Sequence, residues 1–74
     1  MMECILYNID GVPVQWFQGF DSWRIRYNII GERLLEMFFG DESNCVGIIL
    51  TYENGYDYLL LYEGTKIVFR HDFL

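Results

Sequence analysis

Near its N-terminus the chain places apolar side chains at every second position on both sides of an Asp10-Gly11 pair. Such a pair is a strong signal for a two-residue hairpin turn, because both central positions of that turn need a positive φ. In this register Ile5 faces Trp16, and one face of the hairpin is fully apolar. Pro13 has no backbone N–H, so we expect the second strand to lie at the edge of a sheet.

The last third of the chain alternates in a similar way around two further turn signals. Asn54-Gly55 predicts one two-residue turn and Gly64-Thr65 predicts a second, which has glycine at the first central position as a type II′ turn requires. The two turns define a three-stranded antiparallel meander. Both of its faces are apolar in the middle, so the sheet needs two covers, one of which is normally a helix.

The segment between these units favours a helix by its pattern of apolar residues. Asp21 or Ser22 can serve as its N-cap, and Gly40 can terminate it. A helix would gather an apolar stripe about 100° wide. The stripe consists of Trp23, Tyr27, Ile30, Leu34, Met37 and Phe38.

The same segment also contains a pattern typical of strands. Residues 23–29 alternate strictly, and Asn28 and Gly31 are poor helix formers, so a turn at Gly31-Glu32 is the alternative. We predict the helix, most clearly over residues 32–39. The predicted fold is therefore of the α+β class, a small antiparallel sheet with the element order ββαβββ. The alternative is an all-β meander with a barrel-like form.

The length and composition predict one small domain over residues 1–74, and we identify no internal repeat within it. A chain of this size buries only about 60% of its unfolded surface. Apolar residues nevertheless make up 53% of it and aromatic residues 19%, more than one small core absorbs. We therefore expect a homodimer or a larger assembly.

The charge of the chain limits its partners. Eleven acidic residues against five basic ones give a formal net charge of −6. This balance disfavours direct binding to nucleic acid and to anionic membranes, and favours a basic protein surface such as that of an enzyme that handles nucleic acid. The chain lacks a signal-peptide pattern and an apolar stretch long enough for a membrane helix, so we expect a cytoplasmic protein.

No set of residues in the sequence predicts catalysis. His71 is the only histidine. Catalysis by a lone histidine needs a nucleophile or carboxylate beside it, and the adjacent Asp72 would point to the opposite face of a strand. Cys4 and Cys45 are far apart and are expected to be small, buried, reduced thiols. A metal site built from these three residues has no supporting spacing, and the glycines form no phosphate-binding motif. We predict no enzyme activity, no metal and no cofactor.

The distribution of charge supplies the most specific signal. The chain from Leu34 to Thr65 contains six acidic residues and no lysine or arginine, and tyrosines are interleaved with them. One interpretation is that the acids keep a sticky sheet soluble. The other is that they form a docking surface, because tyrosine combines a large contact area with a polar tip. The candidate partner-binding residues are Asp41, Glu42, Glu53, Tyr56, Asp57, Tyr58, Tyr62 and Glu63.

In size, acidity and lack of a catalytic site, the chain is similar to small viral or mobile-element proteins that inhibit host enzymes. This likeness implies a stoichiometric inhibitor or adaptor that docks its acidic, tyrosine-rich surface on a basic partner. The alternative function is a homo-oligomer that binds a small ligand. Its pocket would be formed by aromatic side chains together with Arg24, Arg26 and Arg33.

Overall fold

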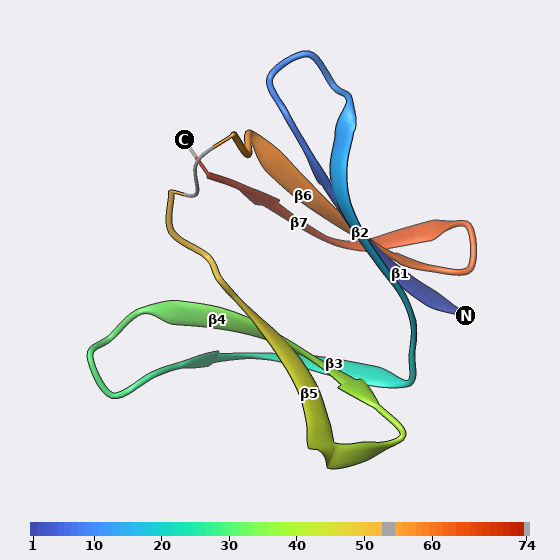
Figure 1. Ribbon diagram of the computed structural model, residues 1–74, viewed down its shortest axis with the longest axis vertical. Coiled ribbons are helices and arrows are strands. Elements are labelled where there is room, and N and C mark those ends of the chain that lie inside the picture. Colours follow the sequence, from blue (N-terminus) through green and yellow to red (C-terminus); the bar gives the residue numbers. More distant parts are fainter. Residues whose placement is uncertain (53–54, 74) are drawn as a thin grey trace.

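The computed structural model describes residues 1–52 and 55–73, and within them the chain forms seven strands and no helix (Figure 1). One antiparallel sheet, sheet A, has the strand order β2-β1-β6-β7, and the other, sheet B, has the order β3-β4-β5. The strands are β1 (Met2–Tyr7), β2 (Pro13–Phe20), β3 (Ser22–Tyr27), β4 (Arg33–Phe39), β5 (Asp41–Ile49), β6 (Tyr58–Glu63) and β7 (Lys66–Asp72).

The predicted helix is wrong, and with it the α+β class; the all-β alternative agrees with the structure. Residues 33–39 form β4, which pairs with β3 in a hairpin. The two-residue alternation of β3 continues through β4, where Leu35 and Met37 are fully buried between the sheets. Leu34 lies on the opposite face of β4, opposite Arg26 of β3. Apolar residues on both faces of β4 therefore imitate a helical stripe.

The residues predicted to cap that helix are used in turns instead. Gly40 joins β4 to β5 with a φ of 90°, a left-handed conformation that favours glycine. The backbone N–H of Gly40 donates a hydrogen bond to the carboxylate of Asp21, which precedes β3. Asp21 thus stabilises a neighbouring turn of sheet B.

Two of the hairpin turns are built from the same short sequence, a repeat that the sequence analysis missed. Tyr-Asn-Ile-x-Gly occurs at residues 7–11 and again at residues 27–31. The Oδ1 atoms of Asn8 and Asn28 accept hydrogen bonds of 2.8–3.2 Å from the backbone N–H groups two and four residues later. The glycine of each turn has a positive φ, 75° and 86°. The first turn is therefore wider than the predicted two-residue Asp10-Gly11 turn.

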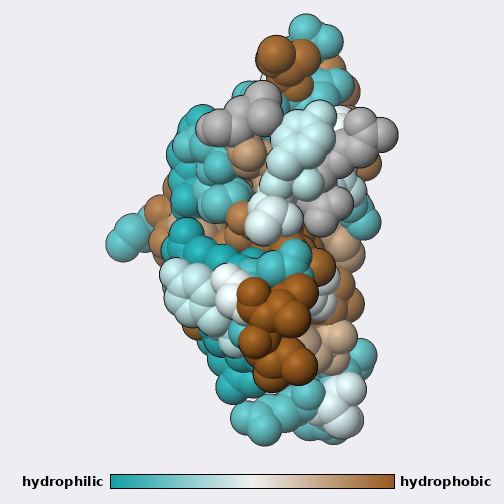
Figure 2. All heavy atoms as spheres, turned by 90° about the vertical axis from the view of Figure 1, so that its left-hand side faces the viewer, coloured by the Kyte–Doolittle hydropathy of each residue, from teal (hydrophilic) through white to brown (hydrophobic). Residues whose placement is uncertain are grey.

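The tips of these two hairpins expose isoleucines. Ile9 and Ile30 keep 80% and 75% of their surface in solvent, and Ile29 is fully exposed. The β3–β4 tip projects at the left of Figure 1, and a hydrophobic patch stands out on that side of the molecule (Figure 2). The asparagine hydrogen bonds hold the turns in shape while these side chains are left largely in solvent.

The predicted C-terminal meander is only partly right. The turn at Gly64-Thr65 is confirmed, because Glu63 and Lys66 pair across it. However, β5 pairs with β4 and β6 pairs with β1, so the two strands lie in different sheets. The other predicted turn is Asn54-Gly55, and Asn54 lies outside the described residues. Alternation alone does not reveal which strands are neighbours, and this ambiguity explains the error.

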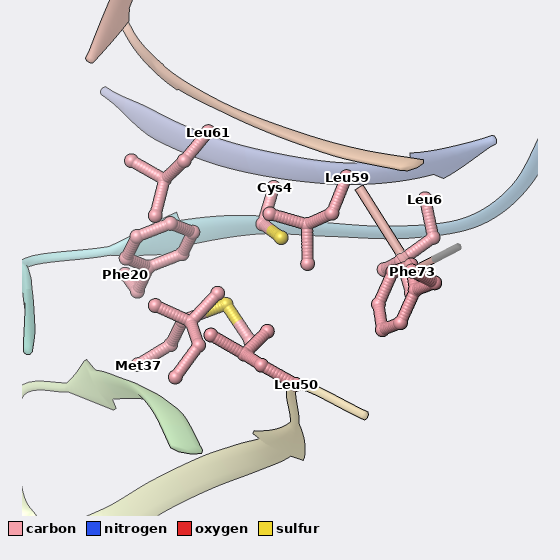
Figure 3. Close-up of a cluster of buried hydrophobic side chains, with 9 residues drawn as sticks. Cys4, Leu6, Phe20, Met37, Leu50, Leu59, Leu61 and Phe73 are labelled. Carbon is pink, nitrogen blue, oxygen red and sulfur yellow. The ribbon is translucent and has the colours of Figure 1, made fainter. Parts of the chain in front are cut away.

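The core fills the space between the two sheets (Figure 3). Sheet A contributes Cys4 and Leu6 from β1 and Leu59 and Leu61 from β6, all of them fully buried. The N-terminal hairpin pairs Ile5 with Trp16 as predicted, and β2 is an edge strand as predicted. Its apolar face, however, points away from sheet B, and Trp16 remains 54% exposed.

Candidate ligand-binding cleft

A cleft opens between the free edges of the two sheets. β2 is an outer strand of sheet A and β5 is an outer strand of sheet B, and no strand among the described residues bridges them. The space between has a volume of about 400 Å³, within the usual range of small-molecule sites. Its lining includes Leu6, Gln15, Phe17, Val46, Ile48 and Tyr56.

The alternation of each strand directs these side chains into the cleft. Gln15 and Phe17 are two residues apart on β2 and pair with Leu6 and Cys4 of β1, whose side chains face the core. Val46 is likewise paired with a buried residue of β4, so its side chain also points between the sheets. The walls of the cleft therefore continue the hydrophobic core out to the surface.

Tyr56 forms one end of the cleft. Its hydroxyl donates a hydrogen bond to Oε1 of Gln15, and its ring lies 5.8 Å from the ring of Phe73. A second hollow of about 280 Å³ adjoins the same ring and is lined by residues that include Tyr52 and Asp57. Tyr56 thus lines both hollows, and its hydroxyl is hydrogen-bonded to Gln15 of β2.

The other side of the sandwich is closed. The rings of Trp23 on β3 and Phe69 on β7 lie 5.5 Å apart across the two sheets. The guanidinium of Arg33 lies 5.8 Å from the centre of the same Phe69 ring. Aromatic and cation–π contacts therefore fill this seam, whereas the β2–β5 side is open.

The tyrosines of the predicted docking surface do not lie together. Tyr56 lies at the cleft, whereas Tyr58 and Tyr62 lie on the outer face of sheet A. There Tyr58 stacks on Tyr7 at 4.8 Å, and the hydroxyls of Tyr7 and Tyr62 are 3.2 Å apart. This hydrogen bond and partial burial raise the pKa of Tyr7 to about 12. The guanidinium of Arg70 lies 4.6 Å above the ring of Tyr58.

The acids of that predicted surface are also dispersed. Asp41 and Glu42 begin β5 and are exposed, next to the turn at Gly40. Asp57 directly precedes β6 and Glu63 ends this strand of sheet A. Glu53 lies outside the described residues. The structure therefore does not gather these side chains on one face.

The arginines proposed for a ligand pocket line neither hollow. Arg24 and Arg26 lie on the outer face of sheet B, where their Nε atoms donate to the same oxygen of Glu36 at 2.8 and 2.7 Å. These hydrogen bonds lower the pKa of Glu36. The third arginine, Arg33, belongs to the closed seam. The cleft is therefore lined by apolar, aromatic and uncharged polar groups rather than by cations.

The two cysteines have different environments. Cys4 is buried, and burial raises the pKa of its thiol to about 12. Cys45 is exposed on the outer face of sheet B, so the expectation that both thiols are buried is wrong for this one. Its Sγ lies 3.8 Å from Oε2 of Glu36. Within the described residues no group of three or more potential metal ligands is found, and His71 packs edge-on against Phe73 at 4.9 Å.

Sequence reasoning missed most of the cleft. Phe17, Val46 and Ile48 have the character of ordinary core residues, and no local motif distinguishes them. Only the pairing of the strands shows that they flank an opening. The one available signal was Tyr56, which the interleaved tyrosine pattern selected for a different reason.

No protein family, curated protein or solved structure matches this chain. In the part of the chain that is described, no helix has the length and apolar character that a membrane crossing would require. The geometry of the cleft therefore carries the functional argument.

Proposed function

We propose that the protein is a binding protein that holds an apolar ligand in the cleft between β2 and β5. The observation that carries the proposal is an open volume of about 400 Å³ that is lined by apolar side chains together with Gln15, Tyr56 and the backbone of Gly47. A sandwich normally closes such a space with side chains, since protein interiors pack to high density. An apolar ligand would gain from leaving water at this place.

The polar groups at the cleft suit recognition rather than catalysis. Gln15 and Tyr56 are hydrogen-bonded to each other, so a ligand meets one amide and one hydroxyl at the end of an apolar trough. A few placed polar groups in an apolar lining are typical of small-molecule sites. This arrangement suits a ligand that combines apolar groups with a hydrogen-bonding group.

A titration with 2-naphthol, which has those two features, tests the proposal. We expect shifts in the ¹H–¹⁵N spectrum at Gly47 and Tyr56 and a Kd of about 1 mM or tighter. Val46→Phe fills the cleft and should abolish these shifts. Ile67→Phe, at a position that is 52% exposed on β7, is the matched control and should bind normally. Equal binding by both variants would refute the site.

Two further interactions of the protein are also predicted. Docking of the acidic, tyrosine-bearing surface on a basic protein has less geometric support, because its residues are dispersed over both sheets. A homodimer could cover the outer face of sheet A, where Val14 and Trp16 are exposed. Sedimentation of the protein at several concentrations measures this directly.

A further inference from the structure

The outer edge of β5 presents free backbone groups to the cleft. Leu50 N–H donates to Arg33 C=O at 2.7 Å, and the β4–β5 register continues from this pair through Ile48 and Val46. In an antiparallel ladder, alternate residues bond to the partner strand and the residues between them point their N–H and C=O groups away. The backbone groups of Gly47 therefore point to the free edge.

Over residues 44–49 this edge lacks the usual protection against strand addition, although Asp41, Glu42 and a register shift in the β4–β5 pairing lie at its other end. β2 carries Pro13, β3 carries Arg24 and Arg26, and β7 carries Lys66 and Arg70. Proline and charged residues, especially lysine, are common devices that block edge-to-edge pairing. Residues 44–49 of β5 contain neither proline nor a charged residue.

A strand added at this edge would also fill the cleft. It would lie about 4.7–4.9 Å beyond β5 and would direct alternate side chains between the sheets. Those side chains would meet Val46 and Ile48 on one side and Phe17 on the other. Main-chain hydrogen bonds and pockets for alternate side chains are the two components of recognition by strand addition.

The charge at one end of β5 selects the partner. Asp41 and Glu42 are exposed at the beginning of this strand, where Arg24 of β3 offsets part of the charge of Glu42. A partner strand with basic residues beside this end would be attracted. A second copy of the chain would bring another net charge of −6 and would be repelled at long range.

We propose that the ligand of the cleft is an extended segment of another protein, with alternating apolar residues and a basic end, which adds to β5 as an extra strand. This inference rests on the proposed binding function of the cleft and specifies its ligand class. The backbone of Gly47 supplies central hydrogen bonds, the cleft takes the apolar side chains, and Asp41 and Glu42 contact the basic end.

A blocked octapeptide of alternating valine and threonine with two lysines at one end is a suitable probe. We expect it to bind with shifts along β5, and about tenfold more weakly when glutamates replace the lysines, a difference that shrinks as salt is raised. A version with N-methyl groups on alternate amides should lose about tenfold or more in affinity, because those amides can no longer donate.

Two variants at one position separate the backbone from the side chain. Gly47→Pro removes an N–H that the β4–β5 ladder does not use, and should weaken peptide binding about tenfold or more. Gly47→Ala keeps that N–H and should bind within about twofold of the wild type. The added methyl group would meet its nearest neighbour, the backbone oxygen of Leu35, at 3.9 Å, an ordinary contact. If Gly47→Pro fails to fold, the N-methylated peptide still tests the same hydrogen bonds.

The outcomes distinguish the two proposals. If 2-naphthol binds in the cleft but the peptide does not, strand addition is wrong and the ligand-binding function stands. If neither binds, both proposals fail. Equal affinity for the methylated and unmethylated peptides, or self-association of the protein through β5 in place of peptide binding, also overturns the inference.

Discussion

Substitution of two adjacent leucines provides the sharpest test of the strand at residues 33–39. Leu35 is fully buried in the core, whereas Leu34 lies on the opposite face of β4 and is only half-buried. Leu35→Ala should cost about 2–5 kcal/mol, the range for a core leucine that leaves a cavity. Leu34→Ala should cost about 1 kcal/mol, because less of its surface leaves water on folding.

The difference is large against the total stability. A domain of this length is stable by about 4–11 kcal/mol, and each kcal/mol moves the melting temperature by about 4–8 °C. Urea unfolding of both variants, followed by circular dichroism, gives the two free energies. If residues 32–39 were a helix with Leu34 on its apolar stripe, Leu34→Ala would lower the free energy of unfolding more than Leu35→Ala. A larger loss for Leu34→Ala than for Leu35→Ala would therefore refute the assigned strand faces.

Three further outcomes are expected. Asn28→Ala should destabilise the protein by about 1–3 kcal/mol in urea unfolding, because two backbone N–H groups lose their acceptor. Burial and the nearby Arg33 lower the pKa of His71, so the unfolded chain binds a proton at this residue at a higher pH than the folded chain does. The free energy of unfolding should therefore fall as the pH is lowered through about 6.5. A His71→Gln variant should lack this slope between pH 5.5 and 7.5. A thiol reagent should modify Cys45 in the native protein, at a rate slowed because desolvation and Glu36 raise the pKa of its thiol, and should modify Cys4 only in denaturant; reaction of both thiols in the native protein would contradict the burial of Cys4.

Local signals in the sequence predicted several turns and failed on the arrangement of the strands. The hairpins around Gly11 and Gly64 follow from residues that favour tight turns, and both are present. β4 was misassigned because Leu34 and Phe38 add apolar residues to its outer face, where a one-sided strand would carry polar ones. Its strand conformation depends on tertiary packing against sheet A, which local periodicity does not contain.

The candidate site was less predictable than the fold. The cleft exists because β5 and β6 enter different sheets, and the sequence between them looked like a simple hairpin. Tyr56 was selected with Tyr58 on composition, yet the two side chains occupy different surfaces. A site formed by two strand edges has no signature in a single stretch of chain.

The repeated asparagine turns have a consequence for how the protein folds. Each turn closes a hairpin between neighbouring strands, a step that takes about 1–10 μs in isolation. By contrast, β6 must pair with β1, joining Leu61 to Cys4 across almost the whole chain, and such distant pairing is slow. During synthesis β6 also leaves the ribosome after the first five strands. Until it arrives, one edge of β1 stays open to pairing with other chains, and a chaperone that shields this edge would raise the yield of native protein.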